Sequence, residues 1–250
     1  MRLRIVDLEV AWISLPLPVP RGLSGGPITH STDMVVRITT DDGLRGIGEG
    51  RGASLPVMAA IAHEALRPLL LGRDASATQA LWTRMHQALL GPNAESNGTA
   101  RWDRRAILSA IAAVDLALWD IKARAAGLSI CRLLGGKPRP VPAYISSGFY
   151  VEGQSVPQMA EATLEELQRG GFRATKIRIG RVPAEGGREE DVGRVRAARE
   201  AVGPDVQVMV DANQAWDAAE AVVRARALEP YHLTWLEEPV PSPGPFLSPG

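Results

Sequence analysis

Apolar and polar residues alternate in three stretches of the first fifty residues, and this period of two predicts β-strands. The stretches cover residues 3–15, 34–39 and 44–49, with a turn at 41–43 between the last two. Pro16, Pro18 and Pro20 follow the first stretch and are expected to end that strand, because proline lacks a backbone N–H. The glycine-rich residues 21–26 are then expected to form a mobile loop.

Apolar residues next recur every three or four positions, which predicts helices. The helices are expected at about 57–71, 76–90 and 103–126. Gly127 is expected to stop the last of them, and residues 91–99 are expected to form a polar loop. Three strands followed by a run of helices indicate an α+β domain.

Strands and helices alternate in the second half of the chain, which predicts βα units and a parallel sheet. Strands are predicted at 141–146, 172–179, 206–211 and 233–237, and helices at 156–169, 188–202 and 216–228. The predicted fold class is therefore an α+β N-terminal domain over 1–136, followed over 137–250 by an α/β (β/α) barrel domain with only about four of its strands present. The proline-rich tail 241–250 is expected to form neither helix nor strand.

Composition and charge narrow the class of protein. Hydrophobic residues make up 45% of the 250 residues and charged residues 22%, as in an ordinary globular protein. The 28 basic and 28 acidic residues balance, so neither a nucleic acid nor a membrane surface is an expected partner. Cys131 is the single cysteine, which indicates a reducing, cytoplasmic location, and it is expected to be a small buried residue. Acidic residues within the apolar N-terminal stretch exclude a signal peptide.

Charged and polar residues stand at the ends of three successive predicted strands. Lys176 and Arg178 share one face of their strand because side chains alternate, and Asp211 and Asn213 share a face in the same way. Glu237 ends the next strand. The carboxyl ends of parallel strands meet at one edge, where α/β enzymes build their sites. The simpler interpretations are an ion pair at a strand edge and an aspartate that caps the following helix.

These residue types suit chemistry at a carboxylate. Carboxylates on adjacent strands suit Mg²⁺, which prefers oxygen ligands. Neighbouring cations suit a substrate carboxylate, and the metal would stabilise the enediolate that forms when the α-proton is removed. Only three of the 28 basic residues are lysines, so Lys176 is a candidate for a function that arginine cannot perform.

Several motifs together resemble the enolase superfamily, in particular its mandelate racemase/muconate-lactonizing group. They are Lys176-Ile177-Arg178, Asp211-Ala212-Asn213, Trp235-Leu236-Glu237-Glu238-Pro239, the stretch 112–124 with Leu133-Leu134-Gly135-Gly136, and Gly46-Ile47-Gly48-Glu49. The resemblance covers about residues 1–240 in the right order. It implies a capping domain over a modified barrel, with Mg²⁺ as the cofactor and a small carboxylate, such as an acid sugar or similar hydroxy acid, as the substrate. It also implies a homo-oligomer for a full-length chain.

The resemblance assigns roles to the strand-end residues. Asp211 and Glu237 match the first two metal ligands, and Asn213 matches a position that supports the site. Lys176 and Arg178 match the two positions of the family's catalytic Lys-x-Lys motif. Two loops of the capping domain, at about 18–26 and 50–53, would close over the substrate.

Two departures from the family pattern bear on the reaction. Arg178 replaces the second lysine of the motif, and an arginine stays protonated and is a poor base. This favours one-base chemistry such as acid-sugar dehydration over two-base racemisation. The third metal ligand and the family's histidine base are expected beyond Gly250. The four histidines of the chain are expected at surface or packing positions, namely His30, His63, His86 and His232.

The leading hypothesis is thus Mg²⁺-dependent removal of an α-proton, by an acid-sugar dehydratase or a racemase/epimerase. A cycloisomerase, or a Schiff-base aldolase that uses Lys176, is the enzymatic alternative. The other alternative is a truncated family member without a competent site, because about four barrel strands and a proline-rich tail are what the sequence contains.

Overall fold

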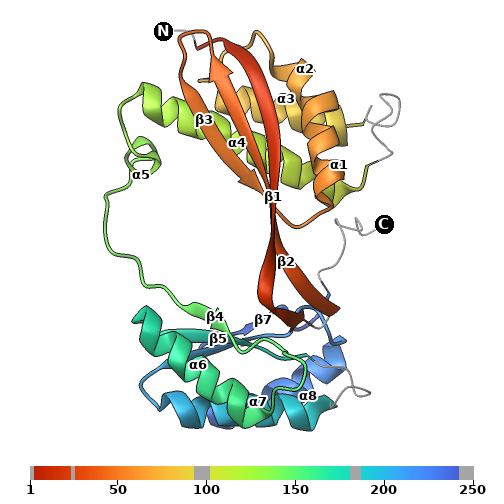
Figure 1. The fold of residues 1–250 in the computed structure, drawn as a ribbon, viewed down its shortest axis with the longest axis vertical. Helices are drawn as coiled ribbons and strands as arrows, with labels where there is room; N and C mark the ends of the chain where they lie inside the picture. Colours follow the sequence, from red (N-terminus) through yellow and green to blue (C-terminus); the bar gives the residue numbers. More distant parts are fainter. Residues whose placement is uncertain (1–2, 24–25, 93–101, 181–186, 242–250) are drawn as a thin grey trace. The chain divides into compact units, whose positions relative to one another are not determined.

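The computed structural model describes residues 3–23, 26–92, 102–180 and 187–241. The chain divides into two compact units, Met1–Pro16 with His30–Pro140 and Leu17–Thr29 with Val141–Gly250. Each unit has a β-sheet and helices of its own (Figure 1). The predicted domain boundary after residue 136 stays a prediction, with the addition that residues 17–29 group with the second half. No helix among the described residues is long and apolar enough to cross a membrane.

The sheet of the first unit contains three strands in the order β1-β2-β3. They are β1 (Ile5–Leu23), β2 (Gly26–Thr40) and β3 (Arg45–Gly50). β2 and β3 pair antiparallel, with Met34 opposite Gly50. The predicted helices cover one face of the sheet (Figure 1). They are α1 (Leu55–Ala60), a π-helical stretch (Ile61–Leu66), α2 (Arg67–Leu70), α3 (Thr78–Leu90) and α4 (Arg104–Ala125).

The first strand does not end at its prolines, so this expectation was wrong. β1 continues through Pro16, Pro18 and Pro20, and residues 21–23 and 26 belong to a long hairpin rather than to a loop. β1 lies at the edge of its sheet, where only every second N–H faces the neighbouring strand. Residues two apart direct their N–H groups to the same side, so three prolines at alternate positions are compatible with an edge strand.

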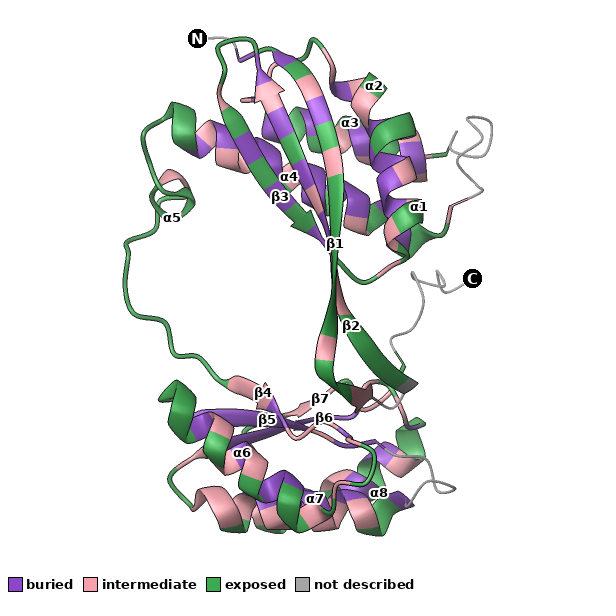
Figure 2. Cartoon of the chain, viewed as in Figure 1, coloured by how far each residue is buried: buried purple, intermediate pink, exposed green. Residues whose placement is uncertain are grey.

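Alternate glycines in β3 let a helix approach the sheet closely. Gly46, Gly48 and Gly50 are the buried positions of β3, and all three face α4. A Cβ atom at Gly48 would overlap the carbonyl oxygen of Ala113, and one at Gly46 would overlap that of Ala117. Only glycine allows so close a contact between backbones. The core of this unit lies between the sheet and α4, and it is apolar (Figure 2).

The second unit contains a parallel sheet in the order β4-β5-β6-β7, as the sequence predicts. Its strands are β4 (Ile145–Ser147), β5 (Ala174–Arg178), β6 (Gln207–Asp211) and β7 (Leu236–Glu237), and its helices are α6 (Val156–Gly170), α7 (Gly187–Val202), α8 (Ala218–Leu228) and a short 3-10 helix (Glu229–Tyr231). The helices lie on one face of the sheet (Figure 1). Ile177 and Ile179 face these helices and join an apolar cluster with Val195 and Trp216. Lys176 and Arg178 therefore lie on the opposite face of β5.

The remaining differences from the predicted elements are local. β4 begins at Ile145 and β7 at Leu236, later than expected, because their pairing with the neighbouring strands begins there. A four-residue helix, α5 (Ile130–Leu133), was not predicted. The expectation of a buried Cys131 was wrong, because α5 contains no buried residue and Cys131 is exposed. Two predictions lie largely outside the described residues, the loop over 91–99 and the tail over 241–250.

Candidate active site at the carboxyl ends of the parallel strands

Three charged residues form one row at the carboxyl ends of β5, β6 and β7. Arg178 pairs in register with Asp211, and Asp211 pairs with Glu237. Partners in a parallel register present their side chains on the same face, so the row lies opposite the helices. Lys176 stands two residues before Arg178 on the same face. The structure therefore brings together the four charged residues that the sequence singled out.

Lys176 bridges the two carboxylates. Its Nζ atom lies 2.7 Å from Glu237 Oε1 and 3.3 Å from Asp211 Oδ2. Only 6% of Lys176 and 2% of Asp211 are exposed. Buried charges are tolerated when they are paired and hydrogen-bonded. In this largely buried part of the sheet, the positive charge of Lys176 is thus paired with the negative charges of Asp211 and Glu237.

Arg178 completes the cluster. Its Nη1 atom donates to a carboxylate oxygen of Asp211 and lies 3.3 Å from Asn213 Oδ1. Its buried Nε atom has no hydrogen-bond partner among the described residues. Burial lowers the pKa of the Arg178 guanidinium, although the charge of Glu237 opposes this. Arg178 therefore keeps an N–H group that could donate a hydrogen bond to a bound anion.

The carboxylate of Glu237 is held in its charged form. Burial alone would raise the pKa of this group, but hydrogen bonds from Lys176 and Trp235 outweigh burial and lower it. The Trp235 Nε1 atom lies 3.2 Å from Glu237 Oε2. The Trp235 ring in turn contacts the edge of the Tyr144 ring, with centroids 5.5 Å apart. Tyr144 and Trp235 are neighbours of the site that the strand-end motifs did not predict as functional.

The backbone after β6 and β7 adopts an unusual conformation. Asn213, Gln214 and Glu238 all have positive φ angles, of 48°, 62° and 43°. The Asn213 N–H donates to Asp211 Oδ1 over 2.9 Å, and the Gln214 N–H donates to the carbonyl of Glu238 over 2.7 Å. Left-handed conformations of non-glycine residues cost energy and are concentrated at functional sites. The Asn213 N–H thus holds the carboxylate of Asp211, and the Asn213 side chain lies beside Arg178. The supporting role that the resemblance implies for Asn213 stays a prediction.

The oxygen atoms of Asp211 and Glu237 are the donors that could hold a metal ion here. They come from register partners on adjacent strands, and both are hard ligands of the kind that Mg²⁺ prefers. In the part of the chain that the structure describes, no group of three or more His, Cys, Asp and Glu side chains is arranged to hold a metal. Among the described residues, Asp211 and Glu237 are thus the two acidic side chains that could bind a metal at this place.

No histidine among the described residues of the second unit lies at the carboxyl ends of the strands. His232, the histidine among that unit's described residues, lies before β7 and so at the amino end of that strand. In the first unit, His63 lies in the π-helical stretch and His86 stacks on Trp82 with ring centroids 4.9 Å apart. These positions agree with the expected surface and packing roles. The sequence-based expectation that a base comes from elsewhere therefore stands as a prediction.

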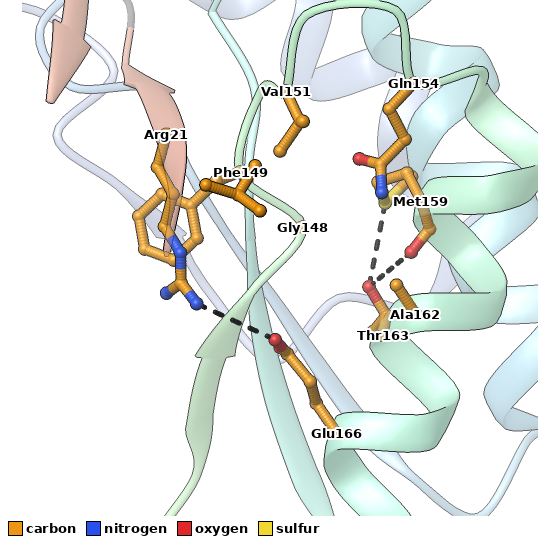
Figure 3. Close-up of a pocket in the computed structure, with 10 residues that line it drawn as sticks. Arg21, Gly148, Phe149, Val151, Gln154, Met159, Ala162, Thr163 and Glu166 are labelled. Atoms are coloured by element: carbon orange, nitrogen blue, oxygen red, sulfur yellow. Dashed lines mark hydrogen bonds and ion pairs between the residues drawn. The ribbon is translucent and has the colours of Figure 1, made fainter. Parts of the chain in front are cut away.

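The end of the β1–β2 hairpin belongs to the second unit and pairs with the segment that follows β4. Gly22 and Tyr150 exchange two backbone hydrogen bonds of 2.5 and 3.2 Å. The Arg21 guanidinium lies 3.9 Å from Glu166 of α6 and 4.9 Å from the centre of the Phe149 ring. Arg21, Phe149 and Glu166 line a pocket of about 300 Å³ (Figure 3).

Comparison with known proteins places these features in a family. The family model described as the N-terminal domain of mandelate racemase / muconate lactonizing enzyme matches residues 7–135. The family model described as enolase C-terminal domain-like matches residues 158–245. The first match contains the three-stranded sheet with its helices, and the second contains the strand-end cluster.

Individual relatives match nearly the whole chain. An arabinonate dehydratase from Saccharolobus solfataricus is 36% identical over 86% of this chain and 54% of its own length. An L-talarate/galactarate dehydratase from Salmonella typhimurium is 30% identical over 96% of this chain and 58% of its own length. The crystal structure of a racemase from Streptomyces coelicolor with bound magnesium matches with a TM-score of 0.83 and 32% identity, over 95% of this chain and 63% of its own.

The chain thus spans 54% to 63% of the length of these three proteins. Both parts of the family architecture are represented in it, a capping domain and, in its second unit, four parallel strands of a barrel domain. The chain belongs to the mandelate racemase/muconate lactonizing enzyme group of the enolase superfamily.

Proposed function

We propose that this chain carries one half of a Mg²⁺-dependent active site that removes the α-proton of a small carboxylate. The observation that carries the proposal is the row Arg178–Asp211–Glu237, with Lys176 between the two carboxylates. Acidic ligands and cationic donors stand together at the carboxyl ends of parallel strands, where this fold builds its sites. Two relatives named as acid-sugar dehydratases and a structure with bound magnesium support the same chemistry.

Asp211 and Glu237 would hold the metal ion. Their positions on adjacent strands fit a shared cation, and their carboxylates provide hard oxygen donors. Mg²⁺ keeps several water ligands, so two protein carboxylates are compatible with binding. When bound, Mg²⁺ supplies a positive charge that stabilises the negative charge developing on the substrate as the α-proton leaves.

Lys176 and Arg178 would bind the substrate carboxylate. Both are cationic donors on the face of the carboxylate row, and the unpartnered Nε of Arg178 suits an anion that accepts two hydrogen bonds. Arginine cannot take the proton, so the proton passes to a base outside the residues assigned here. With one base, that base takes the α-proton and then returns it to the β-hydroxyl, so that the C–O bond breaks and the hydroxyl leaves as water. We therefore favour dehydration of an acid sugar over racemisation.

The same proposal covers the substrate class, the partners, the assembly and the location of the enzyme. The substrate is a small hydroxy acid or acid sugar, and neither nucleic acid nor membrane is a partner. The segments at about 18–26 and 50–53 would contribute to closure over the substrate. A homo-oligomer in the cytoplasm is expected, the location on the basis of the single cysteine.

Isothermal titration calorimetry with Mg²⁺ tests the metal assignment. We expect one ion bound with micromolar affinity, and a loss of at least about 100-fold in Asp211→Asn, because the change removes the negative charge of a direct ligand. Lys176→Met should instead tighten Mg²⁺ binding by about tenfold, because it removes a positive charge next to the two carboxylates. Asp205→Asn, at an exposed aspartate between α7 and β6, is the matched control and should bind like the wild type.

Two outcomes would contradict the proposal. Equal affinities of Asp211→Asn and Asp205→Asn would remove Asp211 from the metal site, and a wild type that binds Mg²⁺ only at millimolar concentration would favour an incompetent family member. The Schiff-base alternative has its own test. Borohydride reduction in the presence of a carbonyl substrate should leave Lys176 unmodified, whereas a covalent adduct on Lys176 would favour an aldolase.

A further inference from the structure

A second group of buried charges lies on the helix side of the parallel sheet, away from the carboxylate row. Asp191 and Arg194 stand on the first turns of α7, and Arg224 stands on α8. Their exposed fractions are 1%, 4% and 2%. The proposed reaction uses none of the three, and charges are rarely buried so completely without a specific arrangement of partners.

Asp191 connects the backbone after β5 with a side chain from the segment after β4. Its two carboxylate oxygens each accept the N–H of Gly180 over 3.1 Å, and Oδ1 accepts the hydroxyl of Tyr150 over 3.1 Å. Arg224 donates to Oδ2 from the neighbouring helix. Burial and the Asp191 charge raise the pKa of Tyr150 far above its ordinary value, so Tyr150 remains a donor.

Arg194 holds the backbone of the same two segments. Its Nη2 atom donates to the carbonyls of Gly148 over 2.6 Å and Phe149 over 3.4 Å, and its Nε donates to the carbonyl of Arg178 over 3.2 Å. Its guanidinium also lies 4.1 Å from the centre of the Tyr150 ring. One planar fork thus fixes three backbone carbonyls at the ends of β4 and β5, which a lysine ammonium could not do with the same geometry.

These contacts reach the candidate site through Arg178 and Phe149. The backbone carbonyl of Arg178 is bound by Arg194, and the Arg178 guanidinium lies 5.3 Å from the centre of the Phe149 ring. The backbone of Phe149 is held by the same Arg194. Asp191 binds the N–H of Gly180, two residues after Arg178. The backbone of Arg178 and the backbone of Phe149, whose ring Arg178 contacts, are therefore both held by residues of α7 on the helix side of the sheet.

We propose that Asp191 and Arg194 are positioning residues, which set the place of Arg178 in the candidate site by holding the segments after β4 and β5. Charged hydrogen bonds in a buried environment are about twice as strong as neutral ones, and a small misplacement of a catalytic group can lower its effect 100-fold or so. That the placement of Arg178 matters for catalysis rests on the function proposed above. That Asp191 and Arg194 set this placement, the geometric part of the proposal, does not depend on that function.

Nuclear magnetic resonance of the whole chain labelled with ¹⁵N-arginine tests that geometric part. The side-chain Nε–Hε signal of Arg178 is assigned by its absence in Arg178→Lys. Arg194→Lys keeps the charge but not the fork, and Asp191→Asn keeps an acceptor but not the charge. We expect either variant to shift the Arg178 signal by more than its linewidth, and to speed amide exchange at Gly180 by at least about tenfold.

Each variant has a matched control. Arg196→Lys changes an exposed arginine on the same helix, two residues after Arg194. Glu220→Gln breaks the other ion pair of Arg224, whose Nε lies 2.6 Å from Glu220, without a contact to the ends of β4 or β5 among the interactions found. Both controls should leave the Arg178 signal and Gly180 exchange as in the wild type. Urea denaturation of all four variants reports their loss of stability separately.

The outcomes distinguish the two proposals. If Arg194→Lys and Asp191→Asn lower stability but leave the Arg178 signal as in their controls, the pair is merely structural and the positioning role is wrong. If the signal moves as expected but the wild type does not bind Mg²⁺, the positioning of Arg178 stands and the proposed metal-dependent function fails. Should Asp191→Asn not fold, Arg194→Lys alone decides the geometric question.

Discussion

The two units of this protein bury very different residues (Figure 2). Among the described residues of the first unit, the buried polar side chains are those of two threonines, Thr40 and Thr78, and no charged residue is buried. Five charged residues are buried in the described part of the second unit, namely Lys176, Asp191, Arg194, Asp211 and Arg224. A buried charge costs several kcal/mol unless partners compensate for it. The contrast therefore separates a unit stabilised by packing from a unit that maintains charges at defined positions.

The charges of the second unit lie on both faces of one sheet. Lys176 and Asp211 belong to the face with the carboxylate row, whereas Asp191, Arg194 and Arg224 belong to the helices on the other face. In the two proposals made above, the first group acts on a substrate and the second holds the strand ends in place. In the first unit, by contrast, the glycines of β3 bring the backbones of β3 and α4 together, with no space for a side chain between them.

The largest effect on this contrast is expected from the buried charges themselves. Asp191→Ala would remove the buried partner of Arg224, which keeps its ion pair with Glu220, and would leave the Gly180 N–H without that acceptor. It should lower the free energy of unfolding of the second unit by about 3–5 kcal/mol. Glu9→Gln removes an exposed ion pair with Arg37, 2.7 Å long, and should produce no measurable change. Urea denaturation of both variants makes the comparison, and equal losses would show that burial of charge does not distinguish the units.

A smaller effect is expected from packing in the first unit. Gly48→Ala would place a Cβ atom against the backbone of α4 and should cost about 1–3 kcal/mol of unfolding free energy. Gly193→Ala is the matched substitution in α7, where no atom lies within 4 Å of the new Cβ, and it should be neutral or stabilise the helix by up to about 1 kcal/mol. Thermal unfolding of the two variants tests this, and a neutral Gly48→Ala would refute the close contact between β3 and α4.

The smallest effect is expected from acid, which should change the contributions of Glu220 and Asp115 to the free energy of unfolding in opposite directions. Hydrogen bonds from Arg188 and Arg224 lower the pKa of Glu220 in the second unit, so its contribution to stability is present above its unfolded pKa and is lost as the pH falls through its folded pKa. Burial raises the pKa of Asp115 in α4, opposed by a hydrogen bond from Trp119. The cost of charging Asp115 is therefore relieved as the pH falls through its folded pKa.

The free energy of unfolding measured between about pH 6 and pH 3 checks both signs. Glu220→Gln should flatten the loss of stability on acidification, and Asp115→Asn should make the loss steeper, because it removes a group that favours the folded state at low pH. If both variants change the slope in the same direction, the assignment of one of the two pKa shifts is wrong.

The strand-end residues were predictable because their placement follows from local rules. Side-chain alternation puts Lys176 on the face of Arg178, and the parallel order of βα units brings the ends of β5, β6 and β7 to one edge. The register pairs Arg178–Asp211 and Asp211–Glu237 express this directly. Their roles as ligands and catalytic groups are proposals that calorimetry can test.

Other features depend on contacts between segments that are distant in the sequence. The prolines of β1 were expected to end a strand, yet they are accommodated because β1 lies at the edge of its sheet. Nothing in the periodicity of α7 distinguishes Asp191 and Arg194 from a solvated helix face, because their partners Gly180, Gly148 and Tyr150 are 11 to 46 residues away. Tyr144, which is distant in the sequence, became a neighbour of the site only through tertiary contacts, namely the approach of its ring to Trp235 and Lys176.

Several sequence motifs resembled a family that comparison with known proteins then confirmed. Residue types and their spacing predicted the order of the elements and the residues that meet at the carboxyl ends of the strands. These depend on alternation, on helical period and on strand order, which are properties of the local chain. The folded structure decided which charges are buried, which hydrogen bonds hold Arg178 from behind, and where the β1–β2 hairpin ends. Burial and pairing are set by long-range contacts, because a side chain loses its water only when another segment of the chain covers it.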